Sequence, residues 1–165
     1  MFFLVGTFTT SVDPNGVVLA SATRKHCTVP AGRTLLFPVI NNECSNVEPP
    51  PFGPFKNREH LAACNHQFLD TATDLHTEID GVPVNDLQSF RVCQTKLCFN
   101  SPVFDVVLPP DNILGVAAGP AISMSDGFYL LVRPLPVGKH VIHFHGFLPA
   151  GNFALDVTYA PLTVK

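Results

Sequence analysis

The histidines of the segment 140–145 are the residues whose spacing points most directly to chemistry. The segment reads His-Val-Ile-His-Phe-His, and the alternation of side chains along a strand would place His143 and His145 on the same face. Two histidines at positions i and i+2 of a strand can bind one divalent metal ion, as they do in cupin-type barrels. Gly138 lies five residues before His143, as at the start of a cupin signature, but residues 146–153 contain no acid to complete that signature. The segment therefore predicts either a cupin-like metal site at His143 and His145 or a strand face with two solvated histidines.

A third metal ligand would have to come from another part of the chain, and the order of residues does not place one. His60 and His66 are not separated by a helical step, and no HExxH motif is present. The remaining candidates are an acid elsewhere or one of the histidines at positions 26, 60, 66 and 76. We therefore expect no cofactor, with a divalent metal at His143 and His145 as the alternative.

Signatures of nucleophilic catalysis are absent from the sequence. No Gly-x-Ser-x-Gly elbow occurs, and we interpret Asp126-Gly127, which follows Ser125, as a turn that opens a strand at Phe128. His26 and Cys27 are adjacent, so in a strand they would point to opposite faces and could not form a dyad. The catalytic residues remain unknown, and the pattern favours a protein that is not an enzyme.

The composition limits the partners of the chain. Lys and Arg total 10 and the net charge is −3, which disfavours binding to nucleic acid. Hydrophobic residues make up 46% of the chain, yet no apolar run reaches the roughly 18–20 residues of a membrane span. At 165 residues we expect a single domain over residues 1–165.

Five cysteines predict a pattern of crosslinks, since none forms a CxxC pair or a zinc spacing. Cys93 and Cys98 are close enough to clip a hairpin. Cys44 follows a predicted strand and Cys64 lies on a predicted helix, so a bond between them would fix the helix to the sheet. We expect these two disulfides with Cys27 buried and free; the alternative is five reduced core residues. Disulfides imply an oxidising compartment, and we expect a secreted, extracellular or cell-surface protein whose leader has been removed before Met1.

The regular spacing of short apolar segments and turns indicates the fold that would position the histidines and cysteines. Fourteen Phe and 16 Pro favour short strands joined by Pro- and Gly-bearing turns. One helix is predicted over about 58–75, where Leu61, Cys64, Phe68, Ala72 and Leu75 recur at steps of three and four. We therefore predict an antiparallel β-sandwich or jelly roll with this helix packed against it.

The predicted strands continue to the end of the chain. The Asp80-Gly81 turn predicts a tight hairpin, and a second hairpin is expected around Cys93 and Cys98. The segments assigned to strands, from first to last, are 2–8, 17–20, 25–29, 34–40, 76–79, 82–84, 90–93, 97–99, 103–108, 128–133, 139–145 and 153–159.

A group of segments is similar to a known set of proteins. They are Cys-Thr-Val-Pro-Ala-Gly (27–32), Leu-Phe-Pro-Val-Ile-Asn (36–41), Ile-Asp-Gly-Val-Pro-Val (79–84), Leu-Pro-Pro-Asp-Asn (108–112), Ser-Asp-Gly-Phe-Tyr-Leu (125–130) and Gly-Lys-His-Val-Ile-His-Phe (138–144). With these the chain resembles a group of uncharacterised secreted bacterial and archaeal β-rich proteins of unassigned function. The resemblance implies export and a β-rich domain over most of the chain, and it carries no catalytic residues.

The sequence as a whole favours a secreted, non-catalytic β-sandwich with a binding or extracellular structural role and an unknown ligand. The alternative is a metal-dependent enzyme that uses His143 and His145. The apolar strand at Phe2 and the strand near the C-terminus could also be exchanged between copies by edge pairing. Such exchange would give a homo-oligomer or filament; the alternative is that both strands pair within their own domain.

Overall fold

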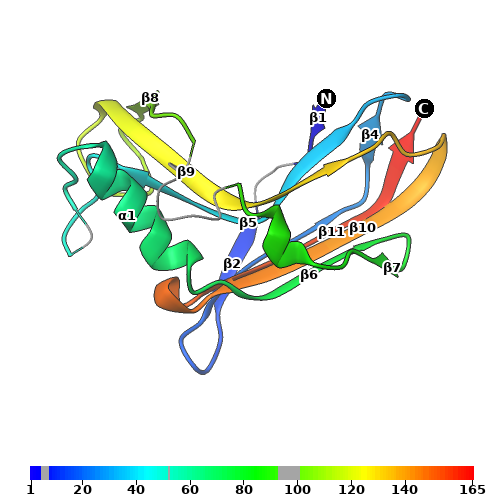
Figure 1. Cartoon of the computed structure of the whole chain (residues 1–165), viewed down its shortest axis with the longest axis horizontal. Coiled ribbons are helices and arrows are strands. Elements are labelled where there is room, and N and C mark those ends of the chain that lie inside the picture. The colour runs from blue at the N-terminus through cyan, green and yellow to red at the C-terminus, as the bar shows by residue number, and fades with distance from the viewer. Residues whose placement is uncertain (5–7, 52, 93–100) are drawn as a thin grey trace.

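The computed structural model describes residues 1–4, 8–51, 53–92 and 101–165, which form two sheets and one α-helix (Figure 1). The predicted β-sandwich with one helix is confirmed. The smaller sheet has the order β1-β5-β9-β8, formed by Phe2–Phe3, Leu35–Ser45, Gly119–Val132 and Phe104–Leu108. The larger sheet has the order β2-β3-β11-β10-β6-β7, formed by Thr9–Val12, Val18–Arg24, Phe153–Val164, Gly138–Leu148, Thr73–Ile79 and Val82–Pro83.

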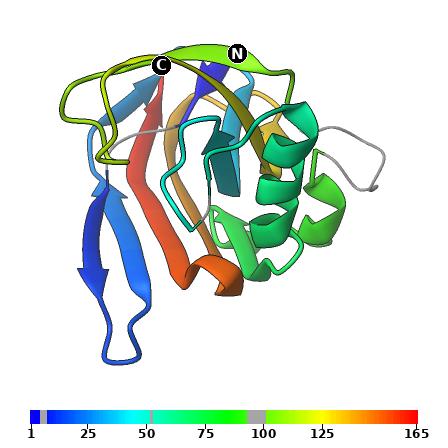
Figure 2. The ribbon, with the colours of Figure 1, turned by 90° about the vertical axis from the view of Figure 1, so that its left-hand side faces the viewer.

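Most strand pairs are antiparallel, as predicted, but β11 and β5 also take part in parallel pairs. β3 pairs in parallel with the first part of β11, and β4 (Cys27–Val29) continues that pairing beside its last part. β1 pairs in parallel with β5. The hairpin of β2 and β3 extends away from the rest of the molecule (Figure 2).

The two sheets approach each other most closely where β5 and β10 cross. A Cβ at Gly146 of β10 would lie 2.9 Å from Ile40 Cβ of β5, so only glycine permits this approach. Phe37 of β5 stacks on Phe144 of β10, with ring centroids 4.9 Å apart, and Phe144 lies 6.4 Å from the ring of Tyr159. These rings form the centre of the core and join the two sheets.

The Asp126-Gly127 pair is not a turn, and this prediction was wrong. Both residues lie inside β9, which runs without a break from Gly119 to Val132. A Cβ at Gly127 would lie 2.6 Å from Asn41 Cβ on the neighbouring strand, so this glycine serves close strand contact rather than chain reversal. The buried Asp126 carboxylate instead accepts hydrogen bonds from Arg91 Nε at 3.1 Å and Nη2 at 2.6 Å.

Helix α1 spans Arg58–Leu69 and is shorter than the predicted 58–75. It begins at Arg58, as predicted. The Asn57 side chain caps this end by accepting a hydrogen bond from the His60 backbone N–H at 3.0 Å. It ends earlier than predicted because Thr73–Ile79 forms strand β6, which pairs with β10. Leu75, which was expected on the helix, therefore lies in a strand. The helix packs on β5 and β9 of the smaller sheet (Figures 1 and 2). Among the described residues, no helix has the length and apolar character to cross a bilayer.

The cysteine prediction is confirmed for the pair that joins helix and sheet. Cys44 of β5 and Cys64 of α1 form a disulfide, while Cys27 is a free thiol that is only partly buried. Cys93 and Cys98 lie outside the described residues, so their pairing stays a prediction. Phe90, expected at the start of a strand, instead ends the 3₁₀ helix η1 (Leu87–Phe90), and the rest of that predicted hairpin lies almost wholly outside the described residues.

The terminal strands pair within the chain. β1 pairs with β5 and β11 lies between β10 and β3 in the larger sheet. β11 therefore uses both of its hydrogen-bonding edges inside the domain, β1 pairs along one edge with β5, and assembly by strand exchange stays a prediction.

Removal of the Cys44–Cys64 disulfide should lower the stability of the fold. The bond closes a loop of 20 residues in sequence, and such crosslinks contribute about 2–4 kcal/mol by restricting the unfolded chain. We expect the Cys44→Ala/Cys64→Ala double variant to lose a free energy of unfolding in that range in urea titrations. Cys27→Ala is the control and should lose less. Wild-type protein can be unfolded without a reducing agent and treated with an alkylating reagent. Alkylation of both Cys44 and Cys64 would contradict the bond.

Candidate functional site

The outer face of the larger sheet carries the predicted histidines. In β10, Ile142 and Phe144 are buried in the core, and His143 and His145 alternate with them toward solvent. The neighbouring strands fix what lies beside each imidazole: His143 is opposite Glu78 of β6, and His145 is opposite His76 of β6. The chain therefore places groups from two strands on one solvent-facing surface.

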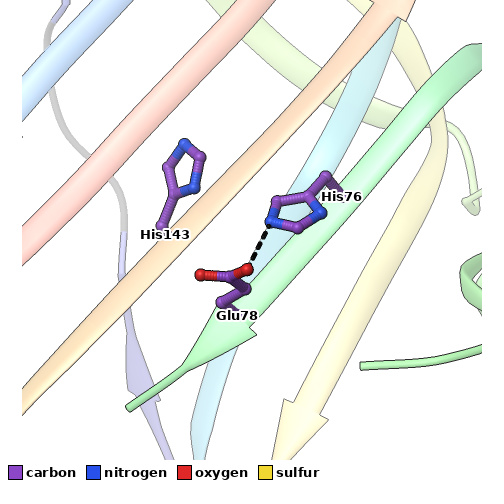
Figure 3. Close-up of side chains that lie close together, drawn as sticks. All are labelled: His76, Glu78 and His143. Carbon is purple, nitrogen blue, oxygen red and sulfur yellow. Dashed lines mark ion pairs between the residues drawn. The ribbon is translucent and has the colours of Figure 1, made fainter. Parts of the chain in front are cut away.

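Three of these groups form a compact set of potential metal ligands. One ligand atom each from His76, Glu78 and His143 lies within 4.8 Å of the other two. Figure 3 shows the His76 and Glu78 side chains rising from β6 toward His143 on β10, with His76 Nε2 3.3 Å from Glu78 Oε1. The rings of His76 and His143 have centroids 5.5 Å apart. Two imidazoles and one carboxylate thus converge on one point above the sheet.

His145 shares the face but lies outside this set. Its Nε2 is 3.0 Å from Asp74 Oδ2, and its Nδ1 is 3.7 Å from Asp156 Oδ2 of β11. His143 also approaches Asp156, with 3.3 Å between its Nε2 and the Oδ1 atom. The sequence predicted His143 and His145 as joint ligands, whereas the observed set pairs His143 with His76 and Glu78. The His143/His145 metal site itself stays a prediction.

The chemistry of this face suits a borderline divalent cation. Neutral imidazole nitrogen and carboxylate oxygen are ligands of Zn²⁺ and of the neighbouring transition metals. Zinc binds such atoms at about 2.0–2.2 Å, which places two ligands of one ion roughly 3–4 Å apart. The side chains of His143, Glu78 and His76 are 31%, 41% and 42% exposed, so small rotations can close the set around an ion.

His76 and Glu78 could have been assigned to the site from their own spacing. They stand at positions i and i+2 of a strand that the sequence predicts at 76–79, so they must share a face. What the sequence does not give is the register that brings β6 beside β10. That pairing joins residues more than 60 positions apart.

The third histidine of β10, His140, has a different role. The His140 ring is bonded at both nitrogens: Nδ1 lies 2.7 Å from Asp80 Oδ2 and Nε2 lies 2.8 Å from the Pro136 carbonyl oxygen. Both neighbours are acceptors, so the ring donates twice and is an imidazolium. The hydrogen bond that His140 donates to Asp80 raises the pKa of His140 above its ordinary value. Desolvation opposes ionisation of Asp80, but the same contact helps to lower the pKa of Asp80 below its ordinary value.

Of the remaining histidine candidates, His26 and His60 are exposed, and His66 lies in a structural network. His66 of α1 lies 3.2 Å from Asp70 and 3.2 Å from Arg91 Nη2. Arg91 also donates to Asp70, and its hydrogen bonds with Asp126 and Asp70 raise its pKa in spite of desolvation. This network ties the end of α1 to β9. Burial raises the pKa of the Cys27 thiol, which keeps it protonated and weakly nucleophilic.

Comparison with known proteins does not assign a family to this chain. No family model matches the chain, and no curated protein matches it. One solved structure aligns over 100% of both chains, that of PbICP-C in complex with falcipain-2, with 14% sequence identity and a TM-score of 0.33. A TM-score this low supports no conclusion about this chain. The resemblance to uncharacterised secreted proteins stays a prediction.

The His140–Asp80 contact predicts that stability falls as the pH rises. Because the folded pKa of His140 is raised, its contribution is complete below the ordinary histidine pKa of about 6.5 and is lost as the pH rises through the folded value. We expect the urea midpoint to decrease on the alkaline side of about pH 6.5, and His140→Gln to remove that part of the decrease. His60→Gln, at an exposed helix position, is the control. A wild-type midpoint that rises with pH in this range would contradict the imidazolium.

Proposed function

We propose that this chain is a non-catalytic binding domain of an oxidising compartment and that its outer sheet face binds a divalent transition metal. The observation that carries the proposal is the convergence of His76, Glu78 and His143, whose ligand atoms lie within 4.8 Å of one another. The ligands come from two hydrogen-bonded strands, so the backbone holds them without help from a loop. A site built on strands is held more precisely than one on loops.

The exposure of the set supports binding rather than catalysis. Catalysis at a metal gains from a closed site that excludes water, because electrostatic interactions are stronger there. Here the three side chains are 31–42% exposed on an open sheet face. A metal on this surface can also be shared with a ligand or a second protein, which fits a binding or extracellular structural role.

The location outside the cytoplasm rests on the crosslink. Disulfides persist in oxidising compartments and are rare where glutathione keeps thiols reduced. The Cys44–Cys64 bond joins the helix to the sheet, so it is a structural bond of the fold. We therefore propose secretion or display at the cell surface.

Zinc titration tests the site. We expect purified protein, stripped with chelator and titrated with Zn²⁺ by isothermal calorimetry, to bind one ion per chain. His76→Ala, Glu78→Gln and His143→Ala should each weaken binding by about tenfold or more, because each removes one of three ligands. Binding should also weaken in acid, because a protonated imidazole cannot bind a metal ion.

Two control variants sharpen this test. His60→Ala changes an exposed histidine on the helix and should leave zinc affinity unchanged. His145→Ala should also retain binding, because His145 is engaged by Asp74 and Asp156. Loss of binding in His145→Ala together with full binding in His76→Ala would replace the proposed set with the His143/His145 pair. Absence of saturable zinc binding in the wild type would remove the proposal.

A metal-dependent enzyme is the second candidate, favoured by the composition of the ligand set. Two histidines and one glutamate leave a fourth zinc position open, as in catalytic zinc sites. The zinc-loaded protein can be assayed against a panel of ester and glycoside substrates. Turnover that disappears in His143→Ala but not in His60→Ala would favour the enzyme over the binding domain.

A further inference from the structure

A second candidate site lies on the opposite side of the larger sheet, between the two sheets. A cavity of about 190 Å³ opens there. Most of its lining is apolar, contributed by Leu4, Phe8, Pro38, Phe144, Leu155, Val157 and Tyr159. Two polar side chains complete it, those of Arg24 and Asn41.

Arg24 faces the inside of the sandwich. It pairs with Tyr159 in the parallel register of β3 and β11, and Tyr159 is buried with its ring near Phe144. Ala20, four residues earlier on the same face of β3, is also buried. The strand therefore directs the Arg24 side chain toward the inner side of the sheet, where it is partly buried.

One nitrogen of the Arg24 guanidinium lacks an acceptor. Its Nε is buried and has no hydrogen-bond partner, and no carboxylate of the described residues lies within ion-pair distance of it. By contrast, the partly buried Arg91 is bound by two aspartates. Buried donors in proteins are almost always paired, because desolvation without a partner is costly. A cationic donor without a partner beside a cavity points to an anion that enters from outside.

We propose that this cavity binds a small monocarboxylate with an apolar body. The carboxylate would lie at Arg24, with the Asn41 amide as a second donor at the edge. The apolar body would contact the rings of Phe144 and Tyr159, which line the cavity.

The size and charge of the cavity select this class of ligand. An apolar cavity of about 150 Å³ accepts benzene, and drug-sized ligands need roughly 300 Å³ or more, so 190 Å³ fits one ring or a short chain. A single guanidinium can neutralise one carboxylate, whereas a phosphate dianion would remain partly uncompensated in an apolar lining. Since His143 and Phe144 point to opposite faces of β10, this site is independent of the metal site.

Phenylacetate and its neutral analogue phenylacetamide provide the test, because they differ in charge and hardly in shape. Binding is measured on the full chain by chemical-shift titration of the amide resonances. We expect phenylacetate to bind wild-type protein about tenfold or more tightly than phenylacetamide, with the shifts centred on β3 and β11. Equal affinities, or no saturable binding of phenylacetate, would overturn the proposal.

Variants of Arg24 supply the second part of the test. Arg24→Met keeps the length of the side chain and removes the charge, so it should abolish the preference for phenylacetate and raise the thermal midpoint. Arg24→Lys should keep part of the preference. Arg133→Met, at an exposed position, is the matched control and should change neither. Two results would contradict the proposed anion site at Arg24. One is a preference for phenylacetate that survives in Arg24→Met, and the other is a lower thermal midpoint in a folded Arg24→Met.

Discussion

The aromatic contact between Phe37, Phe144 and Tyr159 joins the two sheets, and the surfaces of the larger sheet depend on it. It fixes which side of β10 and β11 faces the core, because Phe144 and Tyr159 contribute rings from those strands to one stack. Gly146 permits the close crossing of β5 and β10 that brings the rings together. A register shift of one residue would bury the histidines and expose the rings, so the core pattern determines the position of every side chain on the outer face.

This constraint relates the two proposed sites to each other. Alternation along β10 gives Phe144 to the inner cavity and His143 to the outer face. The same sheet therefore presents an apolar, cationic recess on one side and a surface of imidazoles and carboxylates on the other. Each site uses a chemistry that the other lacks, and neither needs the helix. Helix α1 instead packs on the smaller sheet, where the Cys44–Cys64 disulfide holds it and where Arg91 links His66 of the helix to Asp126 of β9.

Local patterns in the sequence predicted the features that depend on neighbouring residues. Alternation placed His143 and His145 on one face, and the position of Cys64 on a helix predicted its bond to Cys44. The predictions were wrong where one pattern is compatible with two structures. Leu75 fits a helical step and a strand equally well, and it lies in a strand. Asp126-Gly127 has the composition of a turn, but Gly127 allows close contact between two strands. The site partners of His143 were beyond local reasoning. They depend on the pairing of β6 with β10, which joins segments far apart in the chain.

The position of a bound metal ion is the most direct measure of this account. Crystals of the protein grown with one equivalent of Zn²⁺ can be examined by anomalous scattering at the zinc absorption edge. The account predicts one peak on the outer sheet face, within about 2.0–2.2 Å of an imidazole nitrogen of His76, a carboxylate oxygen of Glu78 and an imidazole nitrogen of His143. A peak between His145 and Asp156 without these ligands, or no peak on this face, would contradict it.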